Sequence, residues 1–220
     1  MEANIKGGPA FAYVDVNLAP GEAVVAESNA MSSMNTGIDL TATLNGGLVR
    51  GLMKKLFGGE SLFISHYKNN TQQPQRLVLV RPVPGEIRCI ALDNGEFHLQ
   101  PGAFLASTAG VNLGLRWAGL ISWIAGEGLF KLTVSGSGSV WYGAYGALIE
   151  KQVDGEYIVD TSHLVAYEPS ITLKLQLVGG LFSTIFGREG LVTRVCGKGK
   201  IIVQSRSISG LTAWLNPKFR

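Results

Sequence analysis

Three glutamates at matching points of the chain are the strongest candidates for polar chemistry. Glu60, Glu127 and Glu189 each follow a glycine-led apolar segment. If the fold brings these carboxylates together around a common axis, they could bind a cation or share a proton. If they stay apart, each accepts backbone N–H bonds where a short helical turn ends. We favour the second interpretation and predict no metal site.

The three histidines show no pattern of metal ligands. His66, His98 and His163 include no His-x-His pair, and a gap-free alignment places His98 opposite Ile158 and His163 opposite Ala103. We therefore expect surface or hydrogen-bonded histidines. The sequence also has no phosphate-binding loop, dinucleotide fingerprint, nucleophile elbow or Cys-x-x-Cys pair. The prediction is a protein without catalytic residues, without a cofactor and without enzyme activity.

A second candidate is a set of apolar side chains that recurs three times, just before the glutamates. We favour the interpretation that they form core within one molecule, and a subunit interface is the alternative that a triplicated apolar loop leaves open. Shallow membrane insertion is a third interpretation, supported by Lys54 and Lys55 in the first copy. The set consists of Leu52, Met53, Leu56, Phe57, Leu120, Ile121, Trp123, Ile124, Leu181, Phe182, Ile185 and Phe186.

An internal repeat must position all of these residues. Gly95-Glu96-Phe97 and Gly155-Glu156-Tyr157 align without gaps at an offset of 60 residues, and Pro20-Gly21-Glu22 begins a related pattern in the N-terminal third. Each copy then has seven residues that alternate between apolar and other side chains, at 38–44, 111–117 and 171–177. Such alternation indicates strands with one face buried and one face wet, which is typical of antiparallel sheets.

Glycines mark the expected turns of this repeat. We predict hairpins at Gly136-Ser137-Gly138 and at Gly197-Lys198-Gly199, because tight hairpin turns need residues with positive φ. Glu22, Glu96 and Glu156 each follow a glycine and are expected to lie in turns as well.

Composition agrees with a turn-rich globular β protein. Of 220 residues, 46% are hydrophobic, 16% are charged and 29 are glycine, which excludes disorder, while the lack of a G-X-Y period excludes collagen. The predicted fold is all-β: a triplicated antiparallel β-sandwich, or double-stranded β-helix-like repeats, around a pseudo-threefold axis, with a few short helical turns. Because no Pro/Ser-rich linker separates the copies, we expect one compact domain, 1–220, with repeats at about 10–80, 81–148 and 149–212.

Positive charge gathers in the last quarter of the chain. The net charge is +3, and residues 174–220 contain eight Lys or Arg and one acid. This segment could bind the phosphates of RNA or an anionic membrane surface. We favour the alternative that acids elsewhere on the folded surface balance it. Nearby aromatic residues could stack on bases but more often belong to the core of a sheet; they are Trp117 beside Arg116, Trp141, Tyr142 and Tyr145.

The cysteines and the apolar segments bear on the compartment. Cys89 and Cys196 lie in alternating segments and are predicted to be reduced strand residues. Residues 1–9 lack the apolar region of a secretory signal, and the most apolar stretch, 118–125, is far shorter than the ~20 residues that span a bilayer. We therefore predict a cytoplasmic protein without a transmembrane segment.

Several of these segments resemble a known family. Gly85-Glu86-Ile87, residues 99–106, residues 126–130, and Val159-Asp160 leading to Leu164-Val165-Ala166 resemble the TRAP-like family of largely uncharacterised bacterial proteins. That family is similar to mitochondrial altered-inheritance (Aim-type) proteins. The resemblance covers about residues 10 to 210 and implies a double-stranded β-helix-like fold in a closed, trimeric homo-oligomer.

The resemblance does not imply the RNA and tryptophan binding of the attenuator members. No Lys/Arg motif or indole pocket can be matched residue by residue in this chain. The mitochondrial relatives are linked to inner-membrane organisation, which implies membrane proximity and nothing more specific.

The resulting prediction is a non-enzymatic, homo-oligomeric β-scaffold that works by binding, with a trimer as the expected state. Two alternatives stay open. One is RNA or other nucleic-acid binding through the basic C-terminal repeat, and the other is peripheral association with a membrane.

Overall fold

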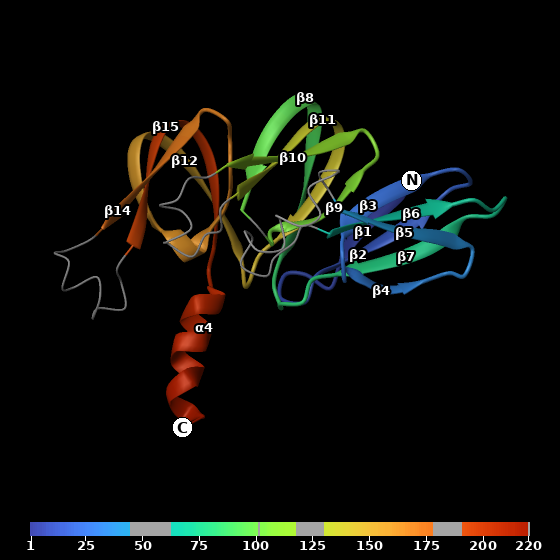
Figure 1. The fold of residues 1–220 in the computed structure, drawn as a ribbon, viewed down its shortest axis with the longest axis horizontal. Helices are drawn as coiled ribbons and strands as arrows, with labels where there is room; N and C mark the ends of the chain where they lie inside the picture. The colour runs from blue at the N-terminus through green and yellow to red at the C-terminus, as the bar shows by residue number, and fades with distance from the viewer. Residues whose placement is uncertain (45–62, 101, 118–129, 178–190, 220) are drawn as a thin grey trace.

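The computed structural model describes residues 1–44, 63–100, 102–117, 130–177 and 191–219. The recurrent apolar set and Glu60, Glu127 and Glu189 lie outside these described residues. Antiparallel strands make up most of the described chain, and one helix projects from them (Figure 1). The predicted all-β class is therefore confirmed.

The strands fall into three groups along the chain, which we call units 1, 2 and 3. The described strands of unit 1 are β1 (Glu2–Lys6), β2 (Tyr13–Leu18), β3 (Ala23–Glu27), β4 (Met31–Met34), β5 (Ile38–Leu44), β6 (Phe63–Asn69) and β7 (Gln75–Val80). Those of unit 2 are β8 (Ile87–Leu99), β9 (Phe104–Thr108), β10 (Val111–Trp117) and β11 (Phe130–Gly143). Those of unit 3 are β12 (Leu148–Asp160), β13 (Leu164–Tyr167), β14 (Ile171–Leu177) and β15 (Leu191–Gln204).

Short helices complete the described elements. They are the 3₁₀ helix η1 (Thr161–His163), the α-helix α4 (Ile208–Leu215) and the 3₁₀ helix η2 (Asn216–Lys218). The three alternating segments of the sequence are β5, β10 and β14, with the predicted bounds. Strict alternation therefore located these strands correctly.

Units 2 and 3 share one pairing pattern. In unit 2, β8, β9 and β10 each pair with β11, and in unit 3, β12, β13 and β14 each pair with β15. The registers agree too, since Val111 faces Gly136 in unit 2 and Ile171 faces Gly197 in unit 3. In unit 1 two strands, β6 and β7, take the place that the single long strand β11 or β15 has in the other units. β3 and β5 pair with β6, and β2 and β4 pair with β7. Figure 1 shows the three units side by side along the longest axis, and the pseudo-threefold axis stays a prediction.

The predicted glycine hairpins are wrong. β11 continues through Gly136–Gly138 and β15 continues through Gly197–Gly199 as single strands. Gly136 and Gly138 have φ of 107° and 146°, and the pairing of β11 with β8 shifts register between them. These glycines therefore let a continuous strand bulge instead of reversing it.

Of the three glutamates that were expected in turns, only Glu22 lies in one. Glu22 lies where β2 turns into β3, and its carboxylate accepts a hydrogen bond from the Ala19 N–H at 2.7 Å. Glu96 and Glu156 instead lie inside β8 and β12, which run unbroken through the glycines before them. The turn prediction is wrong for these two residues. At the corresponding place unit 1 has two strands, β2 and β3, joined by a turn, whereas units 2 and 3 each have one continuous strand.

Candidate functional site

Consecutive units are joined by the same kind of strand edge. β9 of unit 2 pairs with β3 of unit 1, with Ala106 opposite Ala26. β13 of unit 3 pairs with β8 of unit 2, with Ala166 opposite Leu99. These contacts extend one sheet through all three units, in the order β12-β15-β13-β8-β11-β9-β3-β6-β5.

Units 2 and 3 also each contribute side chains to the hydrophobic core of the preceding unit. The core cluster of unit 1 includes Leu105 and Trp141 from unit 2. The cluster of unit 2 includes Val165 and Ile202 from unit 3. Among the described residues, the buried cluster around Val195 of unit 3 contains side chains of unit 3 alone. Within the part of the chain that the structure describes, unit 3 thus receives no cover of the kind that the other two units receive.

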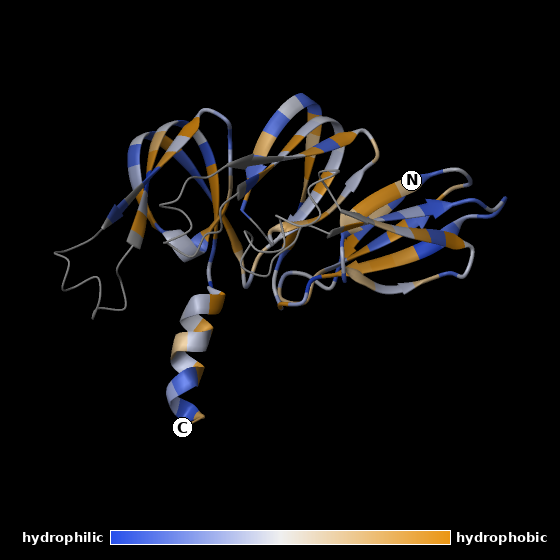
Figure 2. Ribbon diagram, viewed as in Figure 1, coloured by the Kyte–Doolittle hydropathy of each residue, from blue (hydrophilic) through white to orange (hydrophobic). Residues whose placement is uncertain are grey.

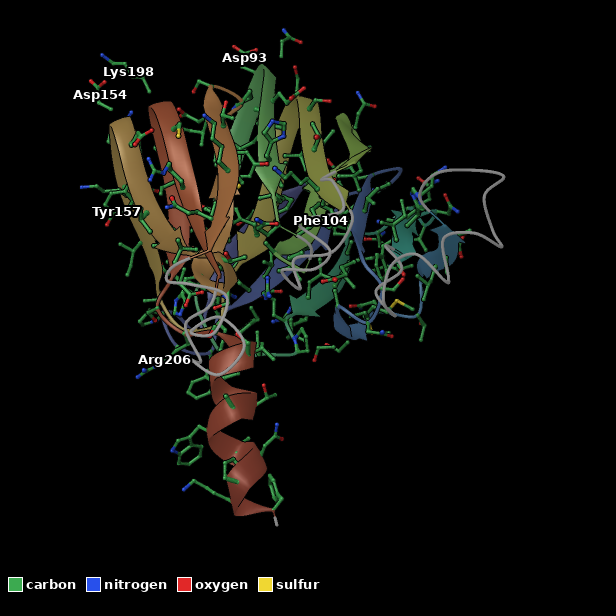
Figure 3. All side chains as sticks on the ribbon, turned by 60° about the vertical axis from the view of Figure 1, so that its left-hand side comes forward. Asp93, Phe104, Asp154, Tyr157, Lys198 and Arg206 are labelled. Atoms are coloured by element: carbon green, nitrogen blue, oxygen red, sulfur yellow. The ribbon has the colours of Figure 1, made fainter. Side chains whose placement is uncertain are left out.

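Two neighbouring apolar side chains near the end of β12 are exposed on the uncovered side of unit 3. Tyr157 is 43% and Ile158 is 55% exposed, whereas their counterparts in unit 2, Phe97 and His98, are 7% and 9% exposed. The His98 ring lies 5.0 Å from the ring of Tyr167 in unit 3. Figure 3 shows Tyr157 on the outer side of β12, far from the centrally placed Phe104. The difference in exposure follows from the missing neighbour.

The opposite end of the molecule has a matching open edge at β4. Met31–Met34 are exposed or half-buried, whereas the counterpart residues Phe104–Ser107 of β9 and Leu164–Tyr167 of β13 are buried. All three strands pair with their own unit through the same shift of register, which identifies them as equivalent. β12 lies toward one end of the longest axis in Figure 1, and β4 lies toward the other end.

Charged side chains join units 2 and 3. Arg88 donates from Nε to Glu86 at 2.7 Å, from Nη1 to Glu150 at 3.1 Å and from Nη2 to the Leu148 carbonyl at 2.7 Å. The Leu148 N–H donates to Glu86 at 2.8 Å. Burial opposes ionisation of Glu86, but these hydrogen bonds hold its pKa below the usual value. These hydrogen bonds hold β8 of unit 2 to the beginning of β12 in unit 3.

The basic residues of β15 lie beside acids of β12. Arg194 contacts Glu156 at 2.7 Å, and Lys200 contacts Glu150 at 3.3 Å. Lys198 lies 3.3 Å from Asp154 at the tip of the strands, where Figure 3 shows both side chains. This agrees with our interpretation that acids balance the basic segment, and it places those acids in the same unit.

The histidines lie on separate elements. His98 Nδ1 is 3.3 Å from Thr133 Oγ1 in β11, and His163 Nδ1 is 2.6 Å from the Gln204 carbonyl oxygen. His66 lies in β6 of unit 1. Within the described ranges, no group of three His, Cys, Asp or Glu side chains could hold a metal ion.

The cysteines are reduced strand residues, as predicted, and the aromatic residues of β11 lie in the core, as expected. Cys89 in β8 and Cys196 in β15 are free strand residues. Trp141 and Tyr142 are 4% and 1% exposed and belong to the core. The side chains of Arg116 and Trp117 lie outside the described residues.

The helix α4 was not predicted from the sequence. Ser207 caps it by accepting a hydrogen bond from the Gly210 N–H at 3.1 Å, and none of its residues is buried. Trp214 and Phe219 are 61% and 81% exposed, and Lys218 Nζ lies 4.5 Å from the centre of the Trp214 ring. Figure 2 shows hydrophobic and hydrophilic residues interspersed along the helix.

A sequence signal for α4 was present. A serine cap stands directly before apolar residues at 208, 211 and 215, which is helical spacing. Among the residues that the structure describes, no helix is long and apolar enough to cross a membrane.

Comparison with known proteins gives one family and related bacterial chains. The family model described as mitochondrial biogenesis AIM24 matches residues 3–206, which leaves α4 outside the match. An uncharacterised protein of Streptococcus pyogenes serotype M6 is 25% identical over 217 residues, covering 94% of this chain and 87% of the relative. A crystal structure of a Streptococcus pyogenes protein is similar with a TM-score of 0.82 and 26% identity, covering 99% of both chains. The Aim-type resemblance is confirmed, and the TRAP-like assignment stays a prediction.

Proposed function

We propose that this chain, which belongs to the mitochondrial biogenesis AIM24 family, is a non-enzymatic, homo-oligomeric binding scaffold. The observation that supports it is the exposure of Tyr157 and Ile158 at positions that the following unit covers in unit 2. Exposed apolar side chains on an open sheet edge favour association with another strand. A closed trimer of TRAP-like type and a cytoplasmic location are the finer parts of this proposal.

Ion pairs between neighbouring strands also support the proposal of a structural protein. Arg76 and Lys6 hydrogen bond to Asp15 and lower its pKa to about 2, which links β1, β2 and β7. Arg194 donates a hydrogen bond to Glu156 at 2.7 Å and so links β15 to β12. These ionised side chains hold neighbouring strands together in the folded protein.

Self-association can be tested directly from the molar mass. Size-exclusion chromatography with light scattering at micromolar concentration is expected to give a multiple of the 23.5 kDa chain, and three copies for a trimer. Dilution into the nanomolar range should shift the mass toward one copy if the contact is reversible. A strict monomer throughout the micromolar range would contradict the homo-oligomeric part of the proposal.

Peripheral membrane contact is the second candidate, and α4 is the observation that favours it. The segment 205–219 exposes Ile208, Trp214 and Phe219 and contains Arg206 and Lys218 without any acid. Amphipathic helices that carry Lys or Arg on one face and Trp, Phe or Leu on the other bind at the interface of anionic bilayers, and this segment contains both kinds of side chain. Nucleic-acid binding through β15 is less well supported, because its cations already lie beside acids of β12.

Vesicle co-sedimentation tests the membrane candidate. The protein should bind vesicles that contain anionic lipid and bind neutral vesicles weakly, and Trp214→Ser should lower the affinity about tenfold because the indole no longer enters the interface. Ile5→Ser in β1 is the control, since Ile5 is also exposed, at 39%, on the N-terminal side of the molecule. Equal binding by the Trp214→Ser variant and the unaltered protein would contradict a role for α4.

A further inference from the structure

We infer that the open edge of β12 is the docking site for β4 of a second copy, so that copies join head to tail as units 2 and 3 join within one chain. The inference rests on the proposed homo-oligomer and adds which strands meet and in what register. It follows from the recurrence of one edge contact along the chain.

The two contacts between consecutive units within the chain have the same register. In both contacts the third residue of the short strand faces the preceding unit at the same place. Ala106 faces Ala26 where unit 2 meets unit 1, and Ala166 faces Leu99 where unit 3 meets unit 2. The following residue then faces one position earlier, as Tyr167 faces His98.

The strands at the two open ends have residues equivalent to those of the two contacts within the chain. Met31 faces Leu79 just as Phe104 faces Tyr142, and each partner is the last residue but one of its strand. Ser33 is therefore the counterpart of Ala106 and Ala166. On the other side, Leu99 faces Leu132, the third residue of β11.

Val159 occupies this position in unit 3, because it faces Thr193, the third residue of β15. The transferred register places Ser33 opposite Val159 and Met34 opposite Ile158. The second copy would thereby cover Tyr157 and Ile158, which are the side chains that the missing neighbour leaves exposed.

The chemistry of both edges fits such a contact. Soluble proteins commonly protect edge strands with charge. On β12 the nearest charges are already engaged, since Glu156 binds Arg194 at 2.7 Å and Asp160 accepts a hydrogen bond from the Ser162 N–H at 2.8 Å. β4 contains methionine and serine alone, so it brings no like charge to the contact.

Closure within one chain is disfavoured by the arrangement of the sheets. β4 ends the four-stranded sheet and β12 ends the eleven-stranded sheet, on opposite sides of the molecule (Figure 1). No pairing between them occurs among the described strands. A contact between two different surfaces is heterologous, and it closes into a ring when the rotation per copy divides a full turn. A trimer is then a ring of three copies.

A charge placed in the contact should break the assembly. Ile158→Asp is expected to raise the dissociation midpoint at least a hundredfold, so that light scattering at micromolar concentration gives one copy. Ile208→Asp is the matched control, because Ile208 is 46% exposed on α4 outside the proposed contact, and this variant should keep the mass of the unaltered protein. Unchanged assembly of the Ile158→Asp variant would overturn the inference.

Cysteine pairing tests the register itself. In a background with Cys89→Ser and Cys196→Ser, a mixture of one copy bearing Met34→Cys and another bearing Ile158→Cys should form a disulfide-linked dimer under mild oxidation. Either variant alone should not cross-link, whereas both substitutions on one chain should give a ladder of higher species. Met34→Cys mixed with Ile208→Cys is the control and should stay uncross-linked.

The outcomes separate this inference from the proposed function. An oligomer whose mixed variants give no cross-link would overturn the β4-to-β12 contact and leave the homo-oligomer intact. A strict monomer would overturn both. A cross-linked dimer from Met34→Cys alone would also overturn the inference, because it would indicate a symmetric contact between two β4 edges.

Discussion

Replacing Gly85 with alanine is expected to lower the free energy of unfolding by about 3 kcal/mol or more, or to prevent folding. A Cβ atom at this position would lie 2.0 Å from the Ala144 carbonyl oxygen and 2.7 Å from the Gly146 nitrogen. Both are backbone atoms, so no side-chain rotation can relieve the collision. Urea unfolding followed by circular dichroism measures the effect.

The position is sensitive because the segments that connect consecutive units meet there: Gly85 lies between β7 and β8, and Gly146 lies between β11 and β12. Gly85 forms isolated parallel bridges with Phe11 on one side and with Gly146 on the other. The Ala12 N–H donates to the Gly85 carbonyl at 3.1 Å, and the Glu86 N–H donates to the Gly146 carbonyl at 2.8 Å. A shift that accommodates a methyl group would therefore disturb both joints at once.

Gly114→Ala is the matched control for this prediction. Gly114 lies within β10, and an added Cβ would find its nearest neighbour at 3.8 Å, which is ordinary contact. The control is expected to change the free energy of unfolding by less than about 1 kcal/mol. If both variants proved equally stable, the close packing at the joint would be contradicted.

The strands that could be predicted from the sequence are those whose burial is decided locally. Residues 111–117 and 171–177 alternate because Val111 and Leu113, and likewise Ile171 and Leu173, pack on a core, whereas in 38–44 Ile38 is buried and Leu40 is 45% exposed. In all three segments the pattern marks the bounds of the strand without reference to any partner. The sequence does not show whether the strand reverses or continues at the glycine pairs. Positive φ suits both a hairpin and a bulge, and only the pairing of β11 with β8 shows that the strand continues through Gly136–Gly138.

The candidate site illustrates the limit of sequence reasoning more clearly. Alignment of the repeats already places His98 opposite Ile158, so the equivalence is present in the sequence. The exposure of Ile158 depends instead on whether another unit follows, which is a property of the assembled strands. The balance of basic and acidic residues is similar, because Arg194 and Glu156 are 38 positions apart and meet through the register of β12 with β15.

The graded burial of one repeated position gives the second large effect. Phe104, Leu164 and Met31 are the first residues of β9, β13 and β4 and hold equivalent places in units 2, 3 and 1. Phe104 is 1% exposed and Leu164 is 4% exposed, whereas Met31 is half-buried on the open edge. Removing a buried side chain costs its transfer free energy and leaves a cavity, so the cost should follow burial and size.

We therefore expect Phe104→Ala to lower the free energy of unfolding by about 4 kcal/mol, Leu164→Ala by about 3 kcal/mol and Met31→Ala by about 1 kcal/mol. Urea unfolding at a concentration where the protein is monomeric gives the comparison, and a loss for Met31→Ala as large as that for Phe104→Ala would contradict it. At concentrations where copies assemble, the cost of Met31→Ala should grow, because a second copy then covers β4 as unit 1 covers β9. The change in this one value with concentration connects the stability of the fold to the docking of its open edges.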